Sequence, residues 1–597
     1  MKRNELFWGK RHNEDSQLTG VREFWTTKIL NALHELTTKE EGASDGFADI
    51  MRVGRPPESS MGDISFPLFP YAKYLELSPA VIASTIAKKL VDEGIRANAA
   101  GGYLNIHIDR VTAIAELFDN IFTLGRSWGS GNELCGQRVM IEYSSPNTNK
   151  PLHLGHLRND ILGESCARIF SARGAKVLRV NLVNDRGVHI CKSMLAYQKF
   201  GNGETPESLR VKSDKFVGDF YVKFVQWAET DKSAEEKVKK MLRDWESGDE
   251  GVRKLWNTMN KWALSGIEAT YRRTGISFDK IYRESETYLQ GRAQVLEGLE
   301  KGIFYKDKGG SVCFDMGEIG LDTKVLLRSD GTTVYMTQDL GTAISRYKDW
   351  PFDQLIYVVG SEQQYHFRAL FHVLDKLGYS WASKLRHLSY GMVNLPEGKM
   401  KSREGTVVDA DELIDKLSSL ALTEIRLKGR EGLVGNAPDI AEKIALAALH
   451  YFLLQVSPTK DMIFNPEESL SFNGNTGPYL QYTAARINSL IAKASSAVLD
   501  MNADPELLNR NDEWELCRKL GDFPDSVSKS AGTLDTSILA AYLHEIARDF
   551  SHYYHEVPIA KASNKALAAA RLSLARAVLT VLKNGFRLLN IPFIESM

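Results

Sequence analysis

The sequence predicts a multidomain α/β protein with a parallel sheet in its central part, an α+β unit before the sheet and an all-helical unit after it. A short apolar run at residues 139–141, a helix that begins near His153 and a second strand at 175–183 follow one another. Strand–helix–strand order predicts parallel pairing with a right-handed crossover. The first 120 residues combine helical patterns with an alternating strand pattern at 103–108, and helical spacing dominates beyond about residue 437.

Length and charge limit the possible functions. The chain has 597 residues, which is enough for three or more domains. Its 75 basic and 76 acidic residues give a net charge of -1, so a nucleic-acid partner would have to bind local basic patches. We predict an N-terminal domain at residues 1–120, a central domain at 121–436 with a largely helical insertion at about 201–310, and a helical domain at 437–597.

Cysteine usage and hydropathy indicate the compartment. The five cysteines are scattered without a C-x-x-C pair, so we predict neither a disulfide framework nor a zinc site. The N-terminal residues are interrupted by charges, and no apolar run is long enough to cross a bilayer. We therefore expect a cytoplasmic protein that has no membrane partner.

The stretch from Gln137 to Phe170 has the features of an anion site. A buried strand is followed by a turn rich in proline and asparagine and then by a helix N-terminus, whose free N–H groups attract phosphates. Gly155 in the first turn would let a flat ligand approach the backbone, and the three-residue spacing of His153 and His156 puts both imidazoles on one helix face. The alternative is that the two histidines only cap and solvate the helix start.

Two motifs in this order resemble the signatures of one enzyme class. His153-Leu154-Gly155-His156, with Lys150 upstream, resembles the ATP-binding signature of class I aminoacyl-tRNA synthetases, and the preceding run from Glu142 to Pro151 resembles its arginyl-tRNA synthetase form. The basic loop at 398–405 resembles the second class I signature. A solvated basic loop is the alternative interpretation of that second motif.

The resemblance implies a fold and an activity. It implies a Rossmann-like catalytic domain, an N-terminal additional domain that contacts the tRNA elbow, and a C-terminal all-α anticodon-binding bundle. The implied ligase activates L-arginine with ATP, releases pyrophosphate, and transfers arginine to the 3′-terminal adenosine of its tRNA for translation. The implied partners are ATP, L-arginine and the tRNA for arginine, with tRNA bound before activation, Mg²⁺ held mainly through the ATP phosphates, and a monomeric enzyme.

The resemblance also assigns residues to ATP and to catalysis. Ser402 stands where most class I enzymes have a second lysine, and the resemblance suggests that Lys150 supplies the missing charge, with Lys401 as an alternative. The expected catalytic residues are Lys150, His153, His156 and Lys399. The expected ATP-binding residues are Ser145, Pro146, His153, Gly155, His156, Met392, Lys399 and Ser402.

Arginine recognition requires carboxylates, because the guanidinium group is planar, has five N–H donors and does not lose its charge. The resemblance places Asp339 and Tyr335 at the guanidinium, with Asp339 as the discriminating residue. For a lone aspartate, a helix-capping role would be the alternative. The full set of expected arginine-binding residues is Glu142, Asn147, His153, Tyr335, Asp339 and Gln363.

Two further regions are expected to contact tRNA, although packing is an equal alternative for each aromatic residue. Base stacking on an aromatic ring contributes about 1–3 kcal/mol. The candidates are Tyr103, Asn105, Tyr479, Tyr482 and Arg486.

One element departs from the family pattern. Asn184-Asp185-Arg186-Gly187 occupies the place of a Gly-Asp-Trp-Gly element in many arginyl enzymes, which leaves its role open.

Two rival functions remain from the sequence. One is another class I synthetase, against which Glu142, Tyr335 and Asp339 favour a cationic amino acid. The other is a non-catalytic RNA-binding paralogue or assembly scaffold, which would have no need of Lys150, His153 and His156.

Overall fold

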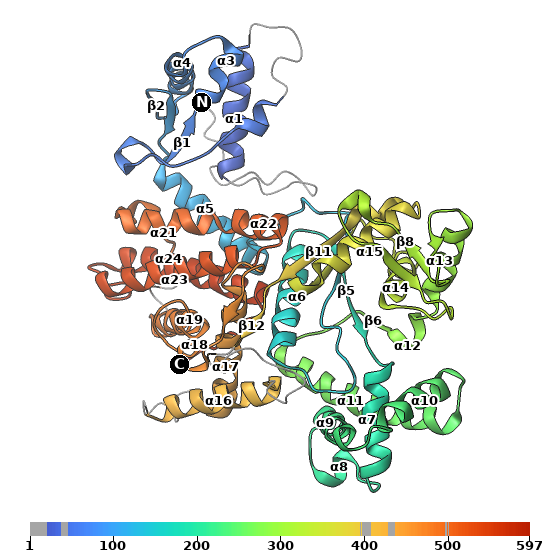
Figure 1. Ribbon diagram of the computed structural model, residues 1–597. Helices are drawn as coiled ribbons and strands as arrows, with labels where there is room; N and C mark the ends of the chain where they lie inside the picture. The colour runs from blue at the N-terminus through green and yellow to red at the C-terminus, as the bar shows by residue number, and fades with distance from the viewer. Residues whose placement is uncertain are drawn as a thin grey trace. The chain divides into compact units, whose positions relative to one another are not determined.

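The computed structural model describes residues 21–37, 46–394, 396, 408–427, 436–495, 498 and 501–597 (Figure 1). Lys399, Lys401 and Ser402 lie outside the described residues. The chain forms two compact units. The first unit comprises Met1–Glu133, Ile487–Val527 and Glu545–Asn584, and the second comprises Leu134–Arg486, Ser528–His544 and Gly585–Met597.

A five-stranded parallel sheet organises the second unit, as the strand–helix–strand pattern predicted. Its order is β11-β10-β4-β5-β6. Val139, Met140 and Ile141 of β4 are completely buried, as expected for a strand covered on both faces. The chain runs from β4 to β5 and β6 on one side and returns to β10 on the other, so the strand order reverses at β4. The strands are β4 (Arg138–Glu142), β5 (Lys176–Val183), β6 (Lys280–Arg283), β10 (Gln354–Gly360) and β11 (Leu385–Tyr390).

Helix α6 (Leu154–Ala172) connects β4 to β5 and is buried almost all round. The sequence predicted one apolar side, but α16 (Ala410–Leu427) and α17 (Ala437–Leu454) also contact this helix. Arg158, Asp160 and Glu164 are each at most 1% exposed as a result. Buried polar groups need partners, so α6 fixes its neighbours through hydrogen bonds as well as through packing.

A second layer of helices covers the sheet and encloses an apolar core that includes Met140, Leu340, Leu355 and Leu370. Two of these helices precede the small antiparallel sheet β7-β8-β9 (Tyr305–Lys306, Val312–Phe314 and Lys324–Leu327) in the chain, and two follow it. They are α12 (Glu284–Thr287), α13 (Gln290–Glu300), α14 (Tyr335–Asp349) and α15 (Gln364–Lys376).

The helical insertion has an apolar core of its own, which includes Phe216, Phe220, Phe224 and Met259. It is built from α7 (Val188–Phe200), α8 (Pro206–Leu209), α9 (Ser213–Thr230), α10 (Ala234–Glu246) and α11 (Glu250–Thr274). The second unit continues with β12 (Val393–Asn394), which pairs with β13 (Met462–Ile463), and with α18 (Pro466–Ser469). Helix α19 (Gly477–Ala492) begins in this unit, and its residues from Ile487 on belong to the first unit.

The first unit joins the N-terminal α+β segment to helices from the end of the chain. Its antiparallel sheet has the order β1-β3-β2. Trp514 donates its indole N–H to Asp63 over 3.0 Å, and the guanidinium of Arg110 lies 5.2 Å from the Trp514 ring. The strands are β1 (Ile64–Pro67), β2 (Ala97–Ala100) and β3 (Tyr103–Ile106), and the early helices are α1 (Val21–Glu35), α2 (Phe47–Ile50), α3 (Ala72–Leu75), α4 (Pro79–Asp92) and α5 (Arg110–Leu124). Helix α21 (Asn511–Gly521) belongs wholly to this unit, whereas α22 (Phe523–Thr533), α23 (Ser537–Glu556) and α24 (Lys565–Leu588) extend across the division.

Arg158 is expected to be the most sensitive side chain of α6. Its guanidinium donates to the carbonyl oxygens of Gly391, Met392, Pro458 and Lys460 at 2.6–3.3 Å. Replacing Arg158 by alanine removes four hydrogen bonds to buried or partly buried carbonyls, and we expect a loss of about 3–5 kcal/mol in the free energy of unfolding. Urea unfolding followed by tryptophan fluorescence measures the change.

The exposed Arg272 provides the matched control for this prediction. Arg272→Ala should change the free energy of unfolding by no more than about 0.5 kcal/mol. Equal unfolding midpoints for the Arg158→Ala and Arg272→Ala variants would contradict the prediction.

Candidate functional site

The turn after β4 is held in an unusual backbone conformation. Ser144 and Ser145 have φ angles of 75° and 50°, in the left-handed region that residues other than glycine rarely adopt. The Ser144 N–H donates to Oδ1 of Asn159 over 2.6 Å, and the Ser145 N–H donates to Oδ1 of Asn181 over 3.1 Å. Two buried or half-buried amides, one from α6 and one from β5, therefore fix the turn at the carboxyl end of β4.

Gly163 of α6 makes this arrangement possible. A Cβ atom at this position would lie 2.3 Å from the ring of Tyr143. The helix can therefore approach the end of β4 only because residue 163 has no side chain. The turn and the helix are in this way packed as one element.

His153 and His156 cap the N-terminus of α6 reciprocally. The Gly155 N–H donates to Nδ1 of His153, and the His153 N–H donates to Nδ1 of His156, both over 3.1 Å. Because Nδ1 of each ring accepts a hydrogen bond, the proton of each neutral imidazole must be on Nε2. The rings lie 3.9 Å apart between centroids, so two N–H donors stand side by side at a helix N-terminus.

The electrostatic surroundings keep both imidazoles neutral. Burial and then the nearby Lys150 cation lower the pKa of His153 to about 3. Burial, followed by the charges of His153 and Lys150, lowers the pKa of His156 well below its usual value. Burial also lowers the pKa of Lys150. The site thus has neutral hydrogen-bond donors, and an anion would be the natural ligand for them.

The segment that ends the basic loop pairs with this turn. The Leu154 N–H donates to the carbonyl of Val408 over 3.3 Å, and the Ala410 N–H donates to the carbonyl of Leu152 over 3.0 Å. Asp409 caps α16 by accepting from the N–H groups of Asp411 and Glu412 at 2.8 and 3.1 Å. The start of α16 is therefore attached directly to the residues around His153.

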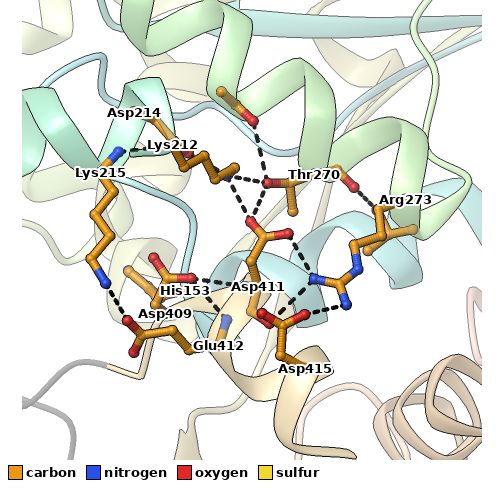
Figure 2. A network of polar contacts seen from close by, with 12 residues as sticks. His153, Lys212, Asp214, Lys215, Thr270, Arg273, Asp409, Asp411, Glu412 and Asp415 are labelled. Atoms are coloured by element: carbon orange, nitrogen blue, oxygen red, sulfur yellow. Dashed lines mark hydrogen bonds and ion pairs between the residues drawn. The ribbon is translucent and has the colours of Figure 1, made fainter. Parts of the chain in front are cut away.

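A network of charges anchors the start of α16 to the helical insertion (Figure 2). Asp411 accepts from Nζ of Lys212 and Oγ1 of Thr270 at 2.7 Å and from Arg273 at 3.1 Å. Arg273 also pairs with Asp415 and Glu442, both at 2.6 Å. Burial alone would raise the pKa of Asp411, but the hydrogen bonds from Lys212 and Thr270 hold it below its usual value. No sequence pattern indicated this network, because its members come from three separate helices and a turn.

Glu142 at the end of β4 is buried and paired with a buried arginine of α14. Arg346 is 1% exposed and forms an ion pair with Oε2 of Glu142. Its guanidinium lies 5.0 Å from the Tyr282 ring and 5.8 Å from the Tyr357 ring. The Ser145 hydroxyl donates to Oε1 of Glu142 over 3.3 Å. Sequence reasoning missed Arg346, because its partner Glu142 lies about 200 residues away in the chain.

Asp339 and Tyr335 are one turn apart on α14. Oδ2 of Asp339 accepts from Nε2 of His366 over 2.6 Å. The Tyr335 side chain is 75% exposed at the start of the helix, and Gln363 is exposed just before α15. His366 was missed as a site residue, and its position just after β10, at the ligand-binding edge of a parallel sheet, was the available signal.

Glu284 is a further carboxylate of this region that the sequence did not single out. Burial raises its pKa to about 7, and the charges of Asp185 and Asp339 add to this effect while Arg186 opposes it. The charge of Asp339 is therefore one of the causes that disfavour ionisation of Glu284. Two neighbouring carboxylates of this kind would be stabilised by a ligand that is a cation.

Asn147 and Pro146 lie at the end of β5. Asn147 forms a parallel bridge with Asn184, and the Asn184 N–H donates to the carbonyl of Pro146 over 2.9 Å. Met392 is 40% exposed, and its N–H donates to Asp461 over 2.7 Å. The expected residues of the β4–α6 turn thus share one edge of the sheet.

Comparisons with known proteins agree with this geometry. The family model for the catalytic domain of class I (R) tRNA synthetases matches residues 129–466, the DALR anticodon binding domain model matches 480–597, and the arginyl tRNA synthetase N terminal domain model matches 23–108. An arginine–tRNA ligase of Treponema denticola is 56% identical over 97% of this chain and 100% of its own length. The chain belongs to the arginyl-tRNA synthetase family.

Further members of the arginyl-tRNA synthetase family show the same coverage. An arginine–tRNA ligase of Borrelia turicatae is 45% identical over 97% of this chain and 100% of its own length. The solved structure of Thermus thermophilus arginyl-tRNA synthetase is 26% identical, has a TM-score of 0.79, and covers 97% of this chain and 100% of its own. The predicted fold class and the stated resemblance are both confirmed.

The residues expected to meet tRNA differ in accessibility. Tyr103 is 46% exposed and packs edge-on against Phe69 at 5.1 Å, whereas Asn105 is only 2% exposed. Tyr479, Tyr482 and Arg486 share one face of α19, with the Arg486 guanidinium 4.5 Å from the Tyr482 ring. Tyr103 and the α19 face stay predicted tRNA contacts. Asn105 also stays a prediction, and the residues packed around it would have to move before its side chain could reach tRNA.

The two signature histidines should not titrate in the physiological range. We expect the ¹³Cε1 NMR signals of His153 and His156, assigned by the variants His153→Asn and His156→Asn, to stay at their neutral positions between about pH 8 and pH 5. Because the folded-state pKa is lowered, their contribution to stability is complete above the unfolded pKa of about 6.5 and decreases as the pH falls toward 3. A midpoint near 6.5 for either signal would contradict the expectation.

Proposed function

We propose that the chain carries out the arginine–tRNA ligase reaction at the edge formed by the β4–α6 turn. The observation that carries this proposal is the pair of reciprocally capped, neutral histidines beside buried carboxylates, in a chain that is 56% identical to an arginine–tRNA ligase. In the first step, a carboxylate oxygen of arginine bonds to the α-phosphorus of ATP, and the bond to pyrophosphate breaks. In the second step, a hydroxyl of the terminal adenosine of tRNA attacks the adenylate carbonyl, and AMP leaves.

Fixed hydrogen-bond donors stabilise the first step. Negative charge increases on phosphate oxygens during the transfer, and donors that are already oriented do not need to reorganise. Nε2–H of His153 and Nε2–H of His156 are such donors, and Lys150 adds a positive charge beside them. Loss of one donor of this kind costs about 3 kcal/mol of transition-state stabilisation. Lys399 is predicted to follow the charge onto pyrophosphate. The other proposed ATP-binding residues are Ser145, Pro146, Gly155, Met392 and Ser402.

Carboxylates recognise the arginine substrate. Asp339 and Glu284 receive the guanidinium, with the exposed Tyr335 beside them on the first turn of α14. At the other end, Oε1 of Glu142 and the polar groups of Asn147, His153 and Gln363 receive the α-amino and carboxylate groups. A site built on such hydrogen bonds rejects a ligand that cannot complete them by about 10⁴ or more.

The remaining partners follow from the same function. Tyr103, Asn105, Tyr479, Tyr482 and Arg486 are the proposed tRNA contacts. Mg²⁺ is proposed to enter with the ATP phosphates, which would hold most of its coordination. Among the described residues there is no group of three or more His, Cys, Asp or Glu side chains that could hold a metal ion. No described helix is long and apolar enough to cross a membrane. A monomeric, cytoplasmic enzyme stays the expectation.

Amino-acid-dependent ATP–pyrophosphate exchange, measured with and without tRNA, tests the function. Arginine-dependent exchange is the expected result. Exchange with a different amino acid would identify another class I synthetase, and the absence of exchange under both conditions would favour the non-catalytic scaffold.

Lys150 is expected to be essential for activation. Lys150→Ala should reduce arginine-dependent exchange by about 150-fold, the equivalent of about 3 kcal/mol, because it removes the charge beside His153 and His156. Lys401→Ala serves as the comparison and should only weaken exchange. Equal rates for the wild type and Lys150→Ala would refute the role of Lys150.

Asp339 should determine arginine affinity rather than ATP affinity. Asp339→Asn keeps the shape of the side chain but removes its charge, so we expect the KM for arginine to rise by about 100-fold while the KM for ATP stays within about twofold. Steady-state exchange kinetics measure both constants. A proportional increase in the two KM values would instead indicate a general disturbance of the site.

A further inference from the structure

Arg186 belongs to the Asn184–Gly187 element after β5 and stands where many arginyl enzymes have a tryptophan. Its side chain is buried and only 7% exposed. The guanidinium lies 3.8 Å from the centroid of the Tyr288 ring and 5.6 Å from that of Trp245. A guanidinium can stack on aromatic faces as an indole does, so the arginine fills an aromatic environment while adding a charge.

This charge is shared between two carboxylates. Arg186 pairs with Glu246 of α10 at 2.6 Å and with Glu284 of α12 at 3.9 Å. With its amide oriented to satisfy both neighbours, Gln338 donates to Glu284 over 3.1 Å and accepts from Arg186 over 3.3 Å. Arg186 is thus connected to Glu284 directly and through one bridging amide, and Gln338 is the residue next to Asp339.

The preceding residue, Asp185, fixes the backbone of the same helix. Its side chain is completely buried and accepts from the N–H and the hydroxyl of Ser285 at 2.9 and 2.8 Å. Asp185 therefore determines where α12 begins, and Arg186 determines where the carboxylate of its first residue, Glu284, lies.

The charges around Glu284 are mostly negative. Asp185 and Asp339 both face it, and Glu246 lies on the far side of Arg186. Arg283 pairs with Asp185 and with Glu286 rather than with Glu284, and His366 pairs with Asp339. Arg186 is accordingly the cation that opposes protonation of Glu284, whose pKa burial raises to about 7.

We propose that Arg186 is a positioning residue for substrate recognition, which orients Glu284 and favours its ionised form so that Glu284 and Asp339 together receive the substrate guanidinium. This inference rests on the proposed arginine site at Asp339. Arg186 does not touch the substrate. Its own positive charge would repel arginine, but the pairing with Glu246 and the stacking on Tyr288 hold that charge behind the carboxylate.

The pH dependence of arginine binding tests the proposal. Arg186→Met should raise the KM for arginine by about tenfold at pH 7 and leave kcat within about threefold, because the protonated fraction of Glu284, whose pKa is already about 7 beside Arg186, increases before arginine binds. The KM should recover toward the wild-type value at about pH 8.5–9, where the carboxyl ionises without help. Arg186→Lys, which keeps the charge, should retain most of the affinity at pH 7.

Arg253→Met is the matched control for packing. Arg253 also stacks on Trp245, at 3.5 Å, and its Nε donates to the Trp245 carbonyl, but its side chain has no ion pair with Glu284 in the described structure. Its removal should leave the KM for arginine unchanged at both pH values. An equal, pH-independent rise in KM for Arg186→Met and Arg253→Met would overturn the proposal in favour of a packing role.

A double-mutant cycle with Glu284→Gln separates the proposal from the general function. If Arg186 acts through Glu284, the effect of Arg186→Met on the KM for arginine disappears in the Glu284→Gln background, whereas additive effects overturn the proposal. Thermal melting establishes that each variant is folded, and Arg186→Gln replaces Arg186→Met if the latter unfolds. A wild type without arginine-dependent exchange would refute the proposed function itself, whereas an active wild type with an Arg186→Met variant of unchanged KM would refute only the role of Arg186.

Discussion

The reciprocal hydrogen bonds between His153 and His156 are the constraint on which the site depends. They satisfy N–H groups at the start of a helix that is buried on all sides, and they leave both Nε2–H groups available for an anion. The strand before the cap ends in a left-handed turn, and the amides of Asn159 and Asn181 hold that turn. One arrangement therefore lets the two histidines cap the helix and, at the same time, present N–H donors to a ligand.

Resident arginines are a second theme of this structure. A site for a free guanidinium needs ionised carboxylates in a half-buried place, where repulsion and burial favour protonation. Arg346 pairs with Glu142, and Arg186 faces Glu284. Each of these arginines stacks on aromatic rings, which accept its flat face and help to hold it in place. The protein thus uses its own guanidinium groups to hold carboxylates at both ends of the proposed substrate site, with Glu142 at the α-amino end and Glu284 at the guanidinium end.

The network around Asp411 shows how distant segments are tied to the site. Lys212 and Thr270 come from the insertion, whereas Asp411 begins the helix that follows the second signature. The backbone of Val408 and Ala410 pairs with the turn before His153. Movement of the insertion relative to α16 would therefore disturb the residues that flank His153 and His156, the proposed hydrogen-bond donors to the ATP phosphates.

The sequence by itself determined the parallel sheet, the position of the β4–α6 turn and the pair of signature histidines, because each depends on local spacing: an apolar strand, a turn and a helix start within about thirty residues. The sequence also showed that Arg186 departs from the family's Gly-Asp-Trp-Gly element, but it did not show what this arginine contacts. Only the tertiary structure brought Arg346, His366, Glu284 and the Asp411 network to the site. Their partners lie on other elements, so ion pairing, burial and stacking arise only when the strands and helices pack, and no local pattern encodes them.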